Sequence, residues 1–133
     1  PLGVFASSGY IAGLPEGATE ADLDWVQWSD EVGHILVSRY VSERLGGRPP
    51  LVTSNSFPAL RAAVQQGLGC MLMPVFQGRI AGLSPVPVEL PIPPPVPTFL
   101  VVPRALRSVP RVAVVVDFLT EYLTRMAAEE GWQ

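Results

Sequence analysis

Four consecutive small polar residues, Thr53-Ser54-Asn55-Ser56, carry the hydrogen-bonding groups with which this sequence could bind a ligand. They follow the apolar pair Leu51-Val52 and precede Phe57, Pro58 and a segment of helical periodicity. Because proline disfavours helical geometry in the residue before it, we expect the helix to begin at or near Pro58. Phe57 has no side-chain acceptor, so the first N–H groups of the helix are left to nearby polar side chains, to water or to a bound anion.

Two interpretations of this polar segment follow. In a parallel sheet the turn would lie at the carboxyl end of a strand, where open α/β folds bind ligands. In the other interpretation, Ser56 or Asn55 simply caps the helix. The spacing alone supports both equally.

Catalytic and metal-binding signatures are missing from the sequence. His34 is the only histidine and Cys70 the only cysteine, so no spacing typical of metal ligands is present. No GxSxG motif marks a nucleophile, and neither a Walker loop nor GxGxxG is found. Asp117 and Glu121 share a face of the last predicted helix without a third ligand, which favours a solvated helix edge. We therefore expect no catalytic residue, no metal and no cofactor, and predict that the protein is not an enzyme.

Four further residues have an ordinary structural interpretation beside a functional one. His34 lies near the start of a predicted helix and could contact a ligand in a cleft, although a surface position is the commoner case. Trp25 and Trp28 fit a strand in the core better than a stacking platform. Cys70 lies in an apolar run, which favours a buried thiol over a nucleophile.

Composition limits the class of protein. The 133 residues suffice for one ordinary domain, and 48% hydrophobic against 16% charged residues indicate a globular chain. The net charge is −3, with nine arginines and no lysine, so no basic surface for nucleic acid is expected. No apolar run is long enough to span a bilayer, and no targeting peptide is recognisable, which predicts a cytoplasmic protein without a membrane partner. The chain opens on proline, so the natural start of the protein is expected to lie upstream.

The elements that would position the polar segment alternate along the chain. Strands are predicted at 2–6, 25–28, 51–53 and 70–73. Helices are predicted at 10–12, from the capping residues Ser29-Asp30-Glu31 to Leu45, and from Pro58 to Gly67. Strands that alternate with helices predict an α/β fold with a mostly parallel sheet.

The last third of the sequence has a different character. Seven of the thirteen residues from 85 to 97 are proline, which excludes a helix and favours an extended crossing segment, with a recognition ligand for a partner protein as the weaker alternative. A strand is predicted at 98–102. A helix is predicted from Pro110, and its apolar sector is wide enough to need partners on two sides.

Several stretches, taken in their order and spacing, resemble the effector-binding (substrate-binding) domain of LysR-type transcriptional regulators. The resemblance spans nearly the whole chain. It rests on PLGVFAS at 1–7 followed by Tyr10, SDEVGHILVSRYVSERL at 29–45, NSFPALRAAVQQGLGCMLMP at 55–74, TFLVV at 98–102 and SVPRVAVVVDFLTEYL at 108–123.

The resemblance implies a periplasmic-binding-protein-like (type 2) fold built from two subdomains. Residues 1–97 would form the second subdomain, with 85–97 as the crossing segment, and 98–133 would supply the hinge strand and C-terminal helix of the first. The rest of the first subdomain and the N-terminal DNA-binding domain would lie outside these residues. A small polar or anionic effector would bind between the subdomains of a homo-oligomer, and DNA would be bound only through the N-terminal domain.

The resemblance also assigns candidate effector-binding residues by their place in the family's pattern. The turn before the helix at 58–67 and the end of the first strand match cleft-lining positions of the family. The match to the family's pattern is weakest for the histidine. These residues are Ser54, Asn55, Ser56, Phe57, Ala6, Ser7 and His34. Two other functions share this architecture: a solute-binding protein or receptor module, and a fragment of a two-lobed enzyme.

Overall fold

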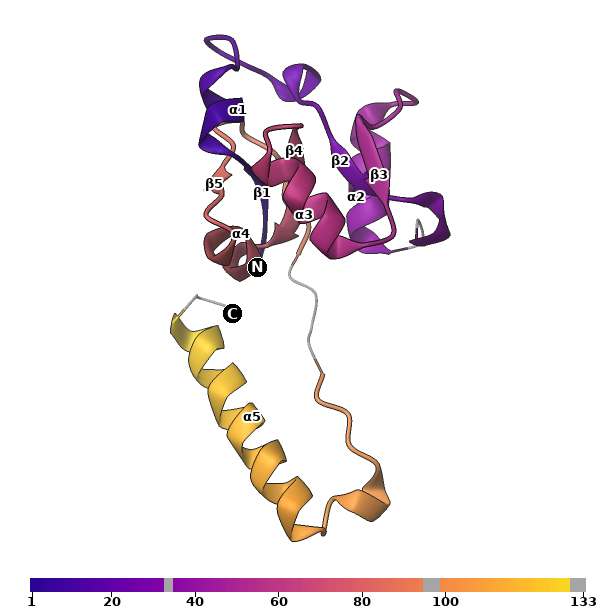
Figure 1. Ribbon diagram of the computed structural model, residues 1–133, viewed down its shortest axis with the longest axis vertical. Coiled ribbons are helices and arrows are strands. Elements are labelled where there is room, and N and C mark those ends of the chain that lie inside the picture. Colours follow the sequence, from indigo (N-terminus) through magenta and orange to yellow (C-terminus); the bar gives the residue numbers. More distant parts are fainter. Residues whose placement is uncertain (33–34, 95–98, 130–133) are drawn as a thin grey trace. The chain divides into compact units, whose positions relative to one another are not determined.

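The computed structural model describes residues 1–32, 35–94 and 99–129 (Figure 1). The chain divides into two compact units, Leu2–Pro94 and Pro95–Gln133, of which the second also includes Pro1. The β-strands of the described residues all lie in the first unit, and the long C-terminal helix α5 lies in the second. The boundary between the units falls inside the proline-rich segment 85–97.

Strands and short helices alternate in the first unit. The strands are β1 (Leu2–Ala6), β2 (Val26–Trp28), β3 (Val52–Ser54), β4 (Cys70–Pro74) and β5 (Ser84–Pro85). The α-helices are α1 (Ser8–Ala12), α2 (Leu36–Leu45), α3 (Phe57–Gln65) and α4 (Val75–Ile80), with 3₁₀ turns at Glu20–Asp22 and Asp30–Val32. The first four predicted strands are therefore confirmed to within one residue.

The strands form a mixed arrangement, so the prediction of a mostly parallel sheet is wrong. β1 pairs antiparallel with both β4 and β5, whereas β2 pairs parallel with β3. A parallel bridge between Trp25 and Cys70 links the two sheets and gives β4 the same direction as β2 and β3. Apolar runs buried on both faces look alike in either direction, so the sequence predicted the strands without predicting the direction of β1.

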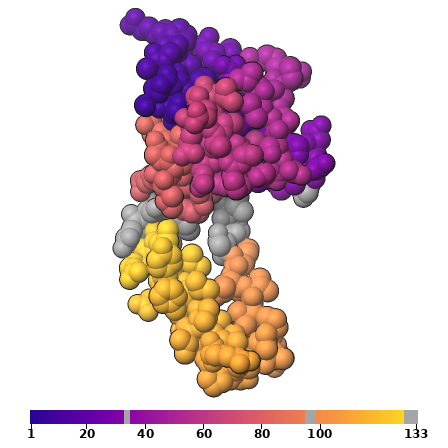
Figure 2. All heavy atoms as spheres, viewed as in Figure 1, coloured from indigo at the N-terminus to yellow at the C-terminus, as the bar shows by residue number. Residues whose placement is uncertain are grey.

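Side chains alternate between the two faces of each strand, and helices cover both faces, so the strands are buried on both sides. Val4 and Leu72 belong to a cluster that α2 covers through Tyr40 and Val41. Their neighbours along the strands belong to the opposite cluster, which α3 covers through its buried residues. That second cluster consists of Phe5, Val26, Leu60, Val64, Met71, Met73 and Leu83. On the face of this unit drawn in Figure 2, the side chains of α3 hide the strands behind them.

Two helices of this unit differ from the prediction. The helix expected from Ser29-Asp30-Glu31 begins only at Leu36, since Ile35 is extended (φ −74°, ψ 151°) and the acidic residues form the Asp30–Val32 turn instead. α4 was not predicted, because its six residues after Pro74 are too few to show a helical period. α3 begins at Phe57, one residue before Pro58, which confirms the predicted start at or near Pro58.

The second unit contains a 3₁₀ turn at Arg104–Leu106 and the twenty-residue helix α5 (Pro110–Glu129). Residues 99–102 are not in a strand, so the strand predicted at 98–102 is not formed over them, and Thr98 lies outside the described residues. A strand needs a neighbour for its backbone groups, and the described residues supply none there. Val114 and Phe118 of α5 are 68% and 64% exposed, which agrees with an apolar sector that needs partners. None of the helices described is long and apolar enough to cross a membrane.

Candidate functional site

The polar turn Ser54-Asn55-Ser56 lies beside the residues that follow β2. Because β2 and β3 are parallel, with Trp28 opposite Ser54, their carboxyl ends meet at one edge of the sheet. The N–H of Ser29 donates to the carbonyl oxygen of Ser54 at 3.0 Å, and this hydrogen bond joins the ends of the two strands. Ser29-Asp30-Glu31 and Ser54-Asn55-Ser56 therefore form one polar edge, as expected for a ligand site in an α/β fold.

The N-terminus of α3 is not capped by a side chain. Ser56 occupies the N-cap position (φ −112°, ψ 112°), but its hydroxyl accepts no hydrogen bond from the helix. Its own N–H donates to Ser54 Oγ at 3.1 Å, so the Ser54 hydroxyl accepts a hydrogen bond within the turn. The N–H groups of Phe57 and Ala59 have no acceptor in the part of the chain that the structure describes. The helix therefore begins with donors available to a ligand or water.

Two contacts hold the turn in place. The side-chain amide of Asn55 donates to Glu31 Oε2 at 3.0 Å and ties the turn to the Asp30–Val32 segment. The ring of Phe57 stacks on Trp28, with 6.1 Å between centroids and 22° between planes. Asn55 and Phe57 thus have structural roles that the sequence did not reveal. The Asn55 side-chain oxygen has no partner among the described residues.

The structure does not bring Ala6 and Ser7 to this turn. Ala6 pairs with Cys70, which also bridges to Trp25, so the end of β1 lies level with the starts of β2 and β4. Ala6 is fully buried, and Ser7 Oγ accepts the N–H of Tyr10 at 3.2 Å as the N-cap of α1. Both residues therefore lie at the opposite end of the strands from Ser54. His34 lies outside the described residues.

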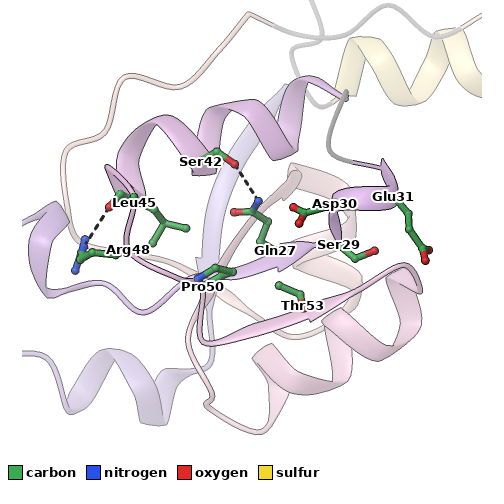
Figure 3. A pocket seen from close by; sticks show the side chains of 10 residues that line it. Gln27, Ser29, Asp30, Glu31, Ser42, Leu45, Arg48, Pro50 and Thr53 are labelled. Atoms are coloured by element: carbon green, nitrogen blue, oxygen red, sulfur yellow. Dashed lines mark hydrogen bonds between the residues drawn. The ribbon is translucent and has the colours of Figure 1, made fainter.

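A pocket of about 520 Å³ opens beneath α2, on the face of β2 and β3 opposite the one that α3 covers (Figure 3). Gln27 and Thr53, which are opposite each other in register, form its floor. The other lining residues come from α2 and from the loops around the two strands. They are Ser29, Asp30, Glu31, Ser42, Leu45, Gly47, Arg48 and Pro50.

Gln27 is the unusual member of this pocket. The residue is only 7% exposed; its side-chain Nε2 donates to Ser42 Oγ at 3.0 Å, while Oε1 has no partner in the described parts of the chain. An unsatisfied buried polar group costs about 1–3 kcal/mol, so it calls for an explanation. Sequence reasoning missed Gln27, although one polar residue in the β-prone run 25–28 was a signal that it could have used.

A metal cluster and the thiol of Cys70 are two other candidates for chemistry among the described residues. No group of three His, Cys, Asp or Glu side chains that could hold a metal ion exists among them. Cys70 is fully buried, and burial raises the pKa of its thiol to about 12, so it is protonated and unreactive at neutral pH. This agrees with the prediction of a buried strand thiol.

Comparison with known proteins assigns the chain to a family. No curated protein matches it. The family described as the LysR substrate binding domain, however, matches residues 1–124 of the 133. Domains of this family have a periplasmic-binding-protein-like fold and sense effectors as parts of transcriptional regulators. The chain therefore belongs to the LysR substrate-binding domain family.

Proposed function

We propose that this chain senses a small molecule as part of a LysR-type transcriptional regulator, and that the effector binds at the turn Ser54-Asn55-Ser56-Phe57. One observation carries the choice of site: the uncapped N-terminus of α3, which opens on a polar turn at the carboxyl end of β3. The family match supports effector sensing in general. The open α/β architecture supports a site at this end of the strands.

The proposed recognition uses hydrogen bonds and no covalent chemistry. The free N–H groups of Phe57 and Ala59 point along the helix axis, where the helix dipole favours a negative or electron-rich group. The hydroxyl of Ser56 adds a donor, and the side-chain oxygen of Asn55 adds an acceptor. Such a set suits a small polar or anionic effector, for example one that carries a single carboxylate.

The rest of the regulator would complete the site. In our proposal residues 1–97 are one effector-binding subdomain, residues 98–133 belong to the other, and the effector binds between them. The boundary between compact units at Pro94 and Pro95 supports this division. Effector binding would then shift the equilibrium between arrangements of a homo-oligomer in the cytoplasm, with DNA bound by a separate N-terminal domain.

The proposed site contains Ser54, Asn55, Ser56 and Phe57. Ala6 and Ser7 are left out, because they lie at the other end of the strands. For His34 an effector contact is still a proposal from the family resemblance alone.

A thermal-shift screen of the complete protein against small carboxylates, inorganic phosphate and neutral polyols tests the function. We expect at least one class to raise the melting temperature, as binding to the native state requires. We also expect the shift to disappear in the variant Asn55→Ala/Ser56→Ala and to persist in Ser8→Ala, an exposed serine of α1 at the other end of the sheet. A shift that survives in the double variant would place the effector elsewhere.

A further inference from the structure

Glu31 lies beside the turn that we assign to the effector. Its Oε2 accepts the side-chain amide of Asn55 at 3.0 Å, and a single residue, Ser56, separates Asn55 from Phe57, the first residue of α3. Consecutive Cα atoms lie about 3.8 Å apart, so the Cα atoms of Asn55 and Phe57 lie within roughly 7.6 Å of each other. A carboxylate and the uncapped helix N-terminus therefore belong to one small region of the polar edge.

The carboxylate of Glu31 does not occupy the free donors of the helix. Neither of its oxygens accepts the N–H of Phe57 or Ala59, and Oε1 has no partner among the described residues. Glu31 is exposed, and Figure 3 shows its carboxylate pointing away from Gln27. A ligand that binds at the start of α3 can therefore also reach Glu31.

The charge at this edge disfavours an effector that carries negative charge alone. Asp30, which precedes Glu31, is also exposed and has no hydrogen bond within the described segments. Neither carboxylate forms an ion pair with an arginine in the described parts of the chain. A plain carboxylate at the start of α3 gains from the helix dipole but is repelled by the charge of Glu31 and, more weakly, of Asp30.

We propose that Glu31 selects an effector that carries an ammonium group beside its carboxylate, that is, a zwitterionic amino acid. This inference rests on the proposed function. The carboxylate of the amino acid accepts the N–H groups of Phe57 and Ala59, and its ammonium donates to Glu31 Oε1. Two hydrogen bonds of about 3 Å, together with the amino acid between them, cover the distance from Glu31 to the helix. The bound molecule is neutral overall and pairs with both signs of charge at this edge.

A thermal-shift screen of the complete protein with the protein amino acids that have uncharged side chains is the first test. We expect at least one of them to raise the melting temperature. Isothermal titration calorimetry then compares that amino acid with its deamino acid, which keeps the carboxylate, and with its amide, which keeps the ammonium. We expect the amino acid to bind at least roughly tenfold more tightly than either analogue, because each analogue lacks one charged hydrogen-bonding group.

The substitution Glu31→Gln isolates the charge, because the new side-chain oxygen can still accept the hydrogen bond from Asn55. It should weaken binding of the amino acid about three- to tenfold without weakening binding of the deamino acid, so the preference between the two ligands falls. A purely structural role of Glu31 would weaken both ligands alike. Asp30→Asn should change the preference by less than about twofold, since Figure 3 shows the Asp30 carboxylate turned toward Gln27. Glu43→Gln, on the exposed side of α2, should leave it unchanged.

Three results would overturn the proposal. They are no thermal shift with any amino acid of the set, a deamino acid that binds as tightly as the amino acid, and an unchanged preference in a Glu31→Gln variant that melts like the parent protein. If simple carboxylates still raise the melting temperature and lose this effect in Asn55→Ala/Ser56→Ala, the effector site stands and only the choice of an amino acid fails. An amino acid that binds this double variant as tightly as the parent would instead overturn the site itself.

Discussion

The side-chain amide of Asn55 donates a hydrogen bond to Glu31 Oε2 at 3.0 Å and joins the loop after β3 to the turn after β2. The two residues are 24 positions apart, and both follow strands that end at the same edge of the sheet. The bond fixes the polar turn in front of α3, whose first N–H groups have no side-chain cap. It thereby orients the turn that we propose as the effector site.

Replacing Asn55 with aspartate should destabilise this edge of the sheet. The new carboxylate would face Glu31 without a donor, so the free energy of unfolding should fall by less than about 1 kcal/mol, because both groups are exposed to solvent. Salt should reduce the loss by screening. Urea unfolding at low and high salt measures it. The double variant Asn55→Asp/Glu31→Gln reverses the donor and acceptor and should recover the loss; failure to recover would show that the bond does not hold the turn.

Gly69 should not tolerate a side chain. Its φ of +143° is strained for any other residue, and a Cβ there would overlap the carbonyl oxygen of Asp24. That oxygen accepts the N–H of Cys70 at 2.8 Å next to the bridge that joins the two sheets. Gly69→Ala should therefore cost roughly 2–4 kcal/mol of unfolding free energy.

Gly17→Ala is the matched control for this substitution. Gly17 also has a positive φ (+72°), but open space surrounds the position of a Cβ. Its substitution should cost only about 1 kcal/mol, the penalty of the backbone conformation alone. Equal losses in the two variants, measured by denaturant unfolding, would contradict the predicted overlap at Gly69.

Cys70 should make stability fall at high pH. Burial raises the pKa of the thiol from 9.0 to about 12, so the native state holds this proton more tightly than the unfolded state. The resulting stability is fully present below pH 9 and is lost as the pH rises toward 12. Burial also raises the pKa values of Tyr10 and Tyr40, which add a loss of the same sign above pH 10. Between pH 9 and 10, Cys70→Ala should show a smaller slope in unfolding free energy than the parent; equal slopes would contradict the prediction.

Arg44 should stabilise α2 and the proline-rich segment together. Its guanidinium lies 3.5 Å from the ring centroid of Tyr40 and donates to the carbonyl oxygens of Tyr40 and Pro91 at 3.2 and 3.3 Å. Nε lies 3.3 Å from Glu20 Oε1, off the direction of a hydrogen bond, so we assign little energy to that half-exposed ion pair.

Arg44→Met should cost about 1–3 kcal/mol of unfolding free energy, since it removes the cation over the ring and the two hydrogen bonds but keeps the length of the side chain. Arg39→Met, on the exposed side of the same helix, should change it by less than about 0.5 kcal/mol. Thermal or urea unfolding measures both variants, and a loss at Arg39 as large as that at Arg44 would contradict the assigned contacts.

Local patterns in the sequence predicted much of the fold. Apolar runs placed β1 to β4 to within a residue, and Pro58 placed the start of α3, because these features depend on neighbours along the chain. The direction of β1 was not predicted, because it depends on pairing with β4 some seventy residues later. The strand at 98–102 was predicted from its apolar residues alone, whereas a strand also needs a paired neighbour.

The candidate site was predictable only where it depends on neighbours along the chain. Pro58, in the first turn of α3, indicated an incomplete cap, and the structure shows one. The sequence did not reveal that Ser7 lies at the opposite end of the strands, because that follows from the antiparallel pairing of β1. Nor did it reveal the pocket, since the burial of Gln27 depends on Ser42, which reaches it from α2.

Calorimetric titration of the complete protein with the effector found by the thermal-shift screen tests the proposed site most directly. The variant Asn55→Ala/Ser56→Ala removes two polar side chains of the turn, together with the hydrogen bond from Asn55 to Glu31, and keeps the backbone N–H groups at the start of α3 and the core residues. We predict that it melts within a few degrees of the parent protein and binds the effector at least roughly tenfold more weakly, as the loss of one or two buried hydrogen bonds implies. An unchanged dissociation constant in the folded variant would contradict effector binding at Ser54-Asn55-Ser56-Phe57.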